Sequence, residues 1–148
     1  KDNVELNDIP KESSMLGKAN LIKEGNDMTI VAYSNMVNVA KEALAAEELQ
    51  NCSIELIDLQ TVSPIDYDTI KNSLKKTKRL LVCQEAPSNS SVGTTVISKI
   101  VESELFHELE VAPKLVSGLH SPMPSAKHLE LNVIPQAEDI TNAVKSML

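Results

Sequence analysis

The stretch MTIVAYS, at residues 28–34, constrains the fold of this chain more than any other. It carries no charge, and its β-branched Thr29, Ile30 and Val31 favour an extended strand. A near-continuous apolar run that ends at turn residues is typical of a strand buried on both faces. After Ser34, a good N-cap residue, apolar side chains recur at helical spacing, at Met36, Val37, Ala40, Ala43, Leu44 and Leu49. A buried strand followed by an amphipathic helix predicts the start of a βαβ unit.

The same alternation of strand and helix continues downstream. Further strands are predicted over residues 53–59, 79–85 and 114–117, each bounded by turn or helix signals. Strands that alternate with helices predict an α/β domain whose mostly parallel sheet lies between layers of helices. In that sheet we expect residues 28–33 to be central, with 53–59 on one side and 79–85 on the other.

Helix starts and buried faces can also be predicted from the residues. Asp66 can cap the second helix, and Ser91 or Asn89 can cap the third. Pro135 stands where a last helix would open, because proline is favoured at the first helical position. The third helix should bury Val92, Val96, Ile97, Ile100, Val101 and Leu105. The last helix should bury Ala137, Ile140, Ala143, Val144 and Met147, and residues 125–131 are expected to form one or two helical turns.

The beginning of the chain differs from the rest. Residues 19–23 alternate weakly and predict a short strand, and the turn residues Gly25-Asn26-Asp27 follow it. Because a tight turn joins antiparallel neighbours most simply, this strand is predicted to be an antiparallel edge strand. Residues 1–15 are polar and without periodicity, which predicts a linker or disordered arm and leaves 16–148 as the domain.

Composition excludes several classes of function. A chain of 148 residues fits one domain with one sizeable core. Its net charge of −7 and pI of about 4.9 argue against nucleic acid or an anionic membrane as the main partner. No apolar run approaches the ~18 residues of a membrane span. Cys52 and Cys83 lack CxxC spacing, so we expect both to be reduced in a reducing compartment.

Motifs that carry chemistry are missing. No glycine-rich phosphate loop follows a strand, and the three histidines lack metal-ligand spacing. A triad drawn from Ser34, an aspartate and a histidine has no GxSxG to support it. Glu85 ends a strand, where open α/β sheets bind ligands, although a role in capping a loop is favoured. The residues alone therefore predict an α/β domain without chemistry of its own, and a stand-alone flavodoxin-like or regulatory binding module stays open.

Several stretches resemble a known family. LGKANLIKEGNDMTIVAYSNMVNVAKEA and IELIDLQTVSPIDYDTIKNSLKKTKRLLVCQE are similar to the C-terminal domain of transketolase-like thiamine enzymes. SPMPSAKHLELNVIPQAEDITNAV most resembles the β subunit of the pyruvate dehydrogenase decarboxylating component. The resemblance covers residues 16–144 and implies a three-layer α/β/α domain with a five-stranded mixed sheet that has one antiparallel edge strand. The branched-chain 2-oxo acid and acetoin dehydrogenases are the related alternatives.

The resemblance also implies a role in oxidative decarboxylation of pyruvate after glycolysis. Thiamine diphosphate and magnesium would be held by the α subunit and by the β subunit's preceding domain, so this domain alone is expected to bind no cofactor or metal, to hold no catalytic residue and to be inactive. Its partners would be the α subunit, a second β subunit and the dihydrolipoyl acyltransferase core. The compartment would be the cytoplasm of a bacterium, or the mitochondrial matrix or plastid of a eukaryote.

Two contact sites are predicted. For the subunit interface we expect the third helix and the loop at residues 118–124 to contribute, through Gly93, Pro122, Met123 and Pro124. Two prolines stiffen the loop, which lowers the entropy lost on association. Gly93 would admit a partner's backbone; the equal alternative is that it fits its helix onto its own sheet.

The second predicted site is for docking to the acyltransferase. In the family, a small basic domain of that protein binds to this domain, and we expect the acidic C-terminal part of the chain to attract it. From Leu80 onward there are eight acidic and four basic residues. The predicted docking residues are Glu138, Asp139 and the terminal carboxylate of Leu148, although acids in a first helical turn also complement the helix dipole. Docking should weaken with added salt and on removal of Met147 and Leu148.

Overall fold

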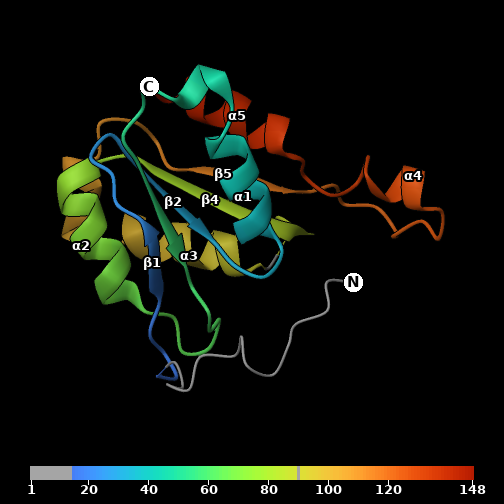
Figure 1. The fold of residues 1–148 in the computed structure, drawn as a ribbon. Coiled ribbons are helices and arrows are strands. Elements are labelled where there is room, and N and C mark those ends of the chain that lie inside the picture. Colours follow the sequence, from blue (N-terminus) through green and yellow to red (C-terminus); the bar gives the residue numbers. More distant parts are fainter. Residues whose placement is uncertain (1–14, 90) are drawn as a thin grey trace, which may run out of the picture.

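The structure is a computed structural model that describes residues 15–89 and 91–148. The N-terminal linker or disordered segment predicted over residues 1–15 lies outside the described residues, except for Met15. One sheet of five strands runs through the domain in the order β1-β3-β2-β4-β5 (Figure 1). The strands are β1 (Asn20–Lys23), β2 (Met28–Ala32), β3 (Ile54–Asp58), β4 (Leu80–Pro87) and β5 (Lys114–Gly118).

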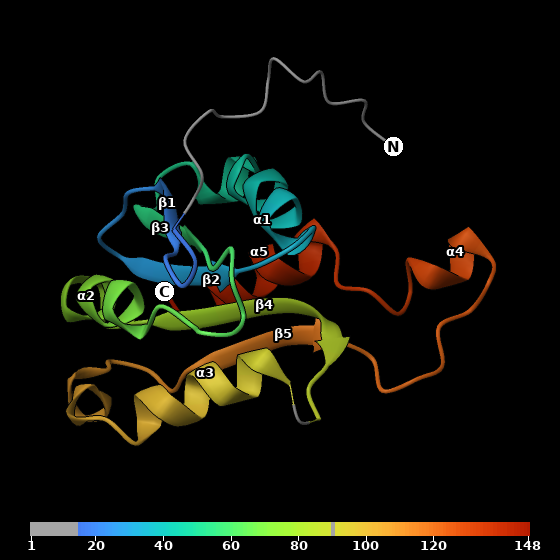
Figure 2. The ribbon, with the colours of Figure 1, turned by 90° about the horizontal axis from the view of Figure 1, so that it is seen from below.

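Helices cover both faces of this sheet (Figure 2). The helices α1 (Met36–Leu44) and α5 (Ala137–Lys145) pack on one face, where Met28, Ile30 and Ala32 of β2 point. The helices α2 (Tyr67–Thr77) and α3 (Val92–Val101) pack on the other, around Val31 and Ile57. The remaining helical segments are short: η2 (Glu47–Leu49), η3 (Glu104–Glu108) and α4 (Lys127–Glu130). Every residue of β2 is buried, which confirms the central strand predicted from the apolar run.

The strand neighbours confirm the predicted topology. β2 pairs in parallel with β3 on one side and with β4 on the other, and β1 is an antiparallel edge strand. The turn argument gave the orientation of β1, and the structure shows that its partner is β3. The turn itself binds the start of β3: the N–H groups of Asn26 and Asp27 both donate to the Ser53 carbonyl, at 2.7 and 2.8 Å. The chain therefore crosses over β3 instead of forming a hairpin.

Helix ends agree in part with the sequence. Asp66 and Ser91 cap α2 and α3 as predicted, each accepting a hydrogen bond from the backbone N–H three residues on. Ser34 is not the cap of α1: it adopts a φ of 56° in the turn out of β2, and the N-cap is Asn35 without a side-chain bond. Pro135 is likewise not the first helical residue, because Gln136 caps α5 and forms a capping box with Asp139.

Two details of the predicted buried faces change. Val101 is 41% exposed rather than buried, because it is the last residue of α3, where the helix turns away from the sheet into η3. Leu44 is only partly buried at the end of α1, and Leu49 is buried from η2 rather than from α1 itself. The apolar residues keep helical spacing beyond Leu44, where α1 ends, which is why the sequence assigned Leu49 to the same helix.

Candidate interaction surfaces

The described residues contain no group of three or more His, Cys, Asp or Glu side chains that could hold a metal ion. No described helix is both long and apolar enough to cross a membrane. The two cysteines are free thiols; Cys83 is buried in β4, and burial raises the pKa of its thiol well above the ordinary range. A protonated, buried thiol is a poor nucleophile, so Cys83 is a core residue.

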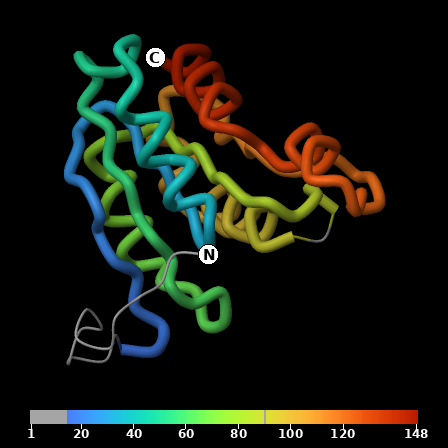
Figure 3. The backbone as a smooth tube through the Cα atoms, turned by 45° about the vertical axis from the view of Figure 1, so that its right-hand side comes forward, coloured from blue at the N-terminus to red at the C-terminus, as the bar shows by residue number. Residues whose placement is uncertain are grey.

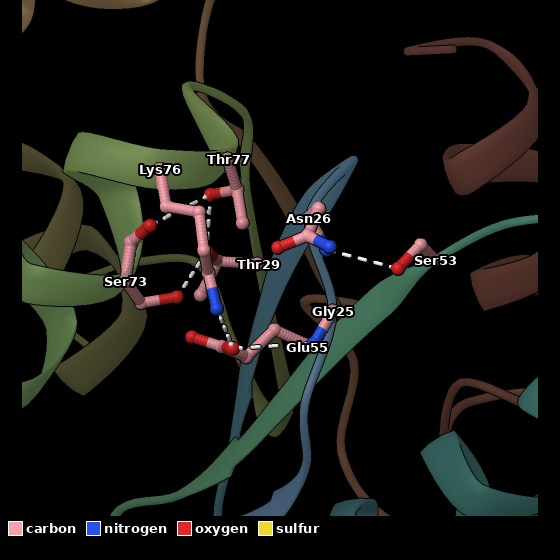
Figure 4. Close-up of polar contacts among 8 residues, drawn as sticks. All are labelled: Gly25, Asn26, Thr29, Ser53, Glu55, Ser73, Lys76 and Thr77. Atoms are coloured by element: carbon pink, nitrogen blue, oxygen red, sulfur yellow. Dashed lines mark hydrogen bonds and ion pairs between the residues drawn. The ribbon is translucent and has the colours of Figure 1, made fainter.

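One charged cluster lies inside the fold (Figure 4). Glu55 of β3 is 3% exposed, and its Oε2 accepts hydrogen bonds from Lys76 Nζ at 2.5 Å and from the Gly25 N–H at 3.2 Å. Burial alone would raise the pKa of the Glu55 carboxyl, but the hydrogen bonds, led by that from Lys76, lower it below its usual value. The pair joins β3, α2 and the turn before β2, three elements that are distant in sequence.

Three hydroxyl groups between β2 and α2 lie beside this ion pair. Thr29 Oγ1 of β2 lies 2.6 Å from both Ser73 Oγ and Thr77 Oγ1 of α2, and Thr77 also donates to the Ser73 carbonyl (Figure 4). These groups are buried and bond one another, which satisfies them without a ligand. The cluster is therefore a structural one that fixes α2 to the sheet. Sequence reasoning missed it, although a glutamate between Ile54 and Leu56 in the predicted strand was a signal.

Gly93, a predicted interface residue, is buried against its own sheet. Its N–H donates to Oε1 of the buried Gln84 at 2.7 Å. A Cβ at this position would lie 2.6 Å from that oxygen and 2.5 Å from Leu115 Cδ1. Gln84 Nε2 in turn donates to the Ala86 and Pro87 carbonyls and shapes the end of β4. These contacts within the domain are enough to require glycine at this position. They favour the alternative that Gly93 fits α3 onto its own sheet, while its role in a subunit interface stays a prediction.

The chain between β5 and α5 projects from the domain. Residues 119–135, called the arm below, run outward, form α4 and return to the start of α5 (Figures 1 and 3). Four large apolar side chains of the arm are exposed: Leu119, Met123, Leu129 and Leu131. Of the predicted interface residues, Pro122 and Met123 are exposed and Pro124 is half-buried. The arm thus presents apolar surface where the sequence placed a subunit contact.

A cleft of about 490 Å³ lies where the arm rejoins the domain. Its apolar wall comes from β5 and the arm, including Leu115, Leu119 and Leu131, and its rim includes Glu138 and Asp139 at the start of α5. Asp139 Oδ2 already accepts the Gln136 N–H at 2.8 Å, so Asp139 acts as a helix cap. Glu138 is exposed and lies in the first turn of α5, which makes it the freer of the two carboxylates.

The predicted docking residues lie at opposite ends of α5. Glu138 and Asp139 lie in the first turn of α5, whereas Leu148 follows its last turn, where its N–H donates to the Val144 carbonyl. A helix rises 1.5 Å per residue, so roughly 14 Å separates the two groups. Met147 is only 3% exposed and packs in the core beneath α1 and α5. Removal of Met147 together with Leu148 would therefore disturb folding as well as any docking, and only Leu148 can be removed as a test.

Comparison with known proteins identifies the family of this domain. Residues 17–140 match the family described as "Transketolase, C-terminal domain", and the chain belongs to that family. Among curated relatives, the pyruvate dehydrogenase E1 component subunit beta of Rickettsia bellii is 41% identical over 88% of this chain and 40% of the relative. The mitochondrial subunit of Pisum sativum is 38% identical over 88% of this chain and 36% of the relative. The chain thus spans about two fifths of the length of these relatives.

Solved structures agree with this assignment. A protein titled "Split gene transketolase, inactive beta4 tetramer" matches with a TM-score of 0.77 and 25% identity, over 95% of this chain and 45% of that one. A 2-oxoglutarate:ferredoxin oxidoreductase from Magnetococcus marinus matches with a TM-score of 0.57 at 13% identity, which shows the shared fold alone. The five-stranded mixed sheet with one antiparallel edge is therefore the fold of this family, as the resemblance implied.

Proposed function

We propose that this chain is the C-terminal domain of the β subunit of a thiamine-dependent pyruvate dehydrogenase and serves subunit assembly and docking in that multienzyme complex. The observation that carries this is the 41% identity to the pyruvate dehydrogenase E1 beta subunit of Rickettsia bellii over 88% of the chain. Thiamine diphosphate and magnesium would be held by the rest of the assembled enzyme, and the described residues offer no metal-binding cluster of their own. The compartment would be bacterial cytoplasm or a eukaryotic organelle, since the relatives include bacterial and mitochondrial proteins.

The proposal is tested with the complete reading frame that contains this chain, produced together with its α subunit. With thiamine diphosphate and magnesium, the assembled protein should reduce an artificial electron acceptor when pyruvate is supplied. Branched-chain 2-oxo acids and acetoin, supplied separately, test the two related dehydrogenases. Turnover of either of these with no turnover of pyruvate would replace the pyruvate assignment, and no turnover of any of the three would contradict the proposal as a whole.

The arm is our candidate for the subunit contact. It places four exposed apolar side chains on one projecting segment, and an apolar surface of this kind on a soluble domain commonly marks a site of protein association. Two prolines, Pro122 and Pro124, limit the conformations of the free loop and so reduce the entropy lost when it is bound. The occupant would be the α subunit or the second β subunit of the same enzyme.

Replacing Met123 and Leu129 by serine should therefore weaken assembly while leaving the domain folded. Each side chain is about half exposed, at 55% and 46%, so it contributes little to the core of the isolated domain. Buried in an interface, each should contribute roughly 1–3 kcal/mol to association. Sedimentation of the assembled enzyme measures the effect, and thermal unfolding of this domain checks the fold. Phe106→Ser, on η3 and 43% exposed, is the matched control and should assemble normally. Equal loss for all three changes would contradict an interface on the arm.

Docking of the basic domain of the acyltransferase is proposed at the start of α5. Glu138 supplies exposed negative charge beside the apolar cleft, so it can attract a cation without first losing an internal partner. Leu148 offers a second, separate carboxylate at the other end of the helix. Exposed charges of this kind steer encounter more than they hold a complex, and salt screens them over about 8 Å at physiological ionic strength.

Glu138→Gln should lower the affinity of the assembled enzyme for the basic domain by up to about fivefold, the value of an exposed ion pair. The effect should fade as salt is added. Deletion of Leu148 alone tests the terminal carboxylate, and Glu48→Gln, on η2 and exposed, is the control. Surface plasmon resonance at several salt concentrations measures each affinity. An affinity for the basic domain that neither salt nor Glu138→Gln changes would show that docking lies elsewhere.

A further inference from the structure

The segment that leads into β1 is held by the loop that leads into α2. The N–H of Gly17 donates to Thr61 Oγ1 at 3.1 Å, and the N–H of Ala19 donates to Asp66 Oδ2 at 3.1 Å. Lys18 Nζ lies 3.8 Å from the same carboxylate oxygen. Residues 17–19, called the strap below, thus contact a loop more than forty residues away in sequence at three consecutive positions.

The strap fits closely against this loop. Gly17 has a φ of 78°, a backbone conformation that favours glycine. A Cβ on Gly17 would lie 2.8 Å from Pro64 Cγ, so the strap lies flush on the proline ring. Thr61 Oγ1 donates to the Pro64 carbonyl at 3.0 Å, which orients its hydroxyl to accept from Gly17. The positive φ and the close approach are two independent reasons why glycine stands here.

Asp66 also serves a second element. Its Oδ1 accepts the Thr69 N–H at 3.2 Å and its Oδ2 accepts Thr69 Oγ1 at 2.8 Å, which caps α2. The side chain is only 3% exposed, so water does not compete for these positions. A carboxylate that accepts hydrogen bonds from both the strap and the helix start is shared between them. No part of the assembly or docking proposed above uses it.

We propose that Asp66 is a shared anchor that latches the strap to the start of α2, and so fixes the point beside the β3–α2 loop at which the preceding polypeptide meets this domain. The latch makes the strap part of the folded domain rather than of a free linker. In any longer protein that contains this domain, it sets the position from which the upstream chain departs.

Three single substitutions separate the two roles of Asp66. D66S keeps a capping oxygen for the Thr69 N–H, because serine is a good N-cap, but its side chain is too short to reach the Ala19 N–H. D66A removes both bonds. G17A leaves Asp66 intact and disturbs the strap alone, through its positive φ and its fit on Pro64. Amide hydrogen exchange of the whole chain, read residue by residue by NMR, reports the Ala19 amide for the strap and the Thr69 and Ile70 amides for the helix start.

We expect the Ala19 amide to exchange about tenfold faster in D66S, the effect of losing one hydrogen bond. It should also exchange faster in G17A, because the strained strap detaches from the loop more often. The first turn of α2 should stay within about twofold of the unchanged protein in both. D66A should accelerate amide exchange in both the strap and the helix start. If D66A does not fold, D66S and G17A still decide the question. The proposal of a shared anchor would be wrong if the Ala19 amide of D66S exchanged at the wild-type rate. It would also be wrong if G17A accelerated exchange equally in the strap and in α2.

Discussion

Replacing Gly93 by valine is expected to destabilise the domain by about 1–3 kcal/mol, the usual cost of overpacking a buried site. The added Cβ would overlap Gln84 Oε1 and Leu115 Cδ1, and Gln84 cannot move aside without breaking its own hydrogen bonds. Gln84 is fully buried and holds the Ala86 and Pro87 carbonyls, and Leu115 lies in β5 under the helix. The measurement is urea unfolding of this domain, followed by circular dichroism.

The matched control for this change is Ser98→Val, at an exposed position of the same helix. Intrinsic helix propensity favours valine over glycine by a few tenths of a kcal/mol, so propensity alone would make Gly93→Val slightly stabilising. A loss confined to Gly93→Val therefore has to come from packing against the sheet. If Gly93→Val keeps its stability in the isolated domain and fails only in assembly, the interface role predicted from the sequence is correct and the packing explanation is wrong.

Glu55→Gln is expected to cost about 1–2 kcal/mol at neutral pH. Removing one partner of a fully buried ion pair costs about 3–5 kcal/mol, but the Lys76 side chain is 42% exposed and can turn to solvent, which reduces the loss. Glutamine keeps an oxygen for the Gly25 N–H, so the change isolates the contribution of the charge. Urea unfolding of both proteins across a pH series measures it.

The pH dependence has a definite sign. Folding lowers the pKa of Glu55, so the ionised carboxylate stabilises the folded state at every pH above its unfolded pKa, near 4.5. That contribution declines as the pH falls through the lowered pKa of the folded state. The difference in unfolding free energy between wild type and Glu55→Gln should thus be constant above about pH 5 and shrink toward acid. Glu48→Gln, at an exposed position, is the control. A difference that stays the same at acid pH would show that the charge of Glu55 does not matter.

Local patterns in the sequence determined most of the framework. The uncharged run at residues 28–34 gave the central strand, because a strand buried on both faces must be apolar on both. Asp66 and Ser91 gave the starts of two helices, because capping depends on residues only three positions apart. The resemblance of the chain to transketolase-like enzymes gave the family, which the match over residues 17–140 confirms.

Contacts between distant residues were decided by the tertiary structure alone. Sequence could orient β1 but could not pair it with β3, because the pairing depends on the Ser53 carbonyl that receives the turn. It grouped Glu138 and Leu148 as an acidic end, and only the structure shows that they lie at opposite ends of α5. The bonds of Glu55 to Lys76 and of Ala19 to Asp66 join positions 21 and 47 residues apart. A periodic pattern reports which face of an element is buried, but only packing decides which side chains meet there.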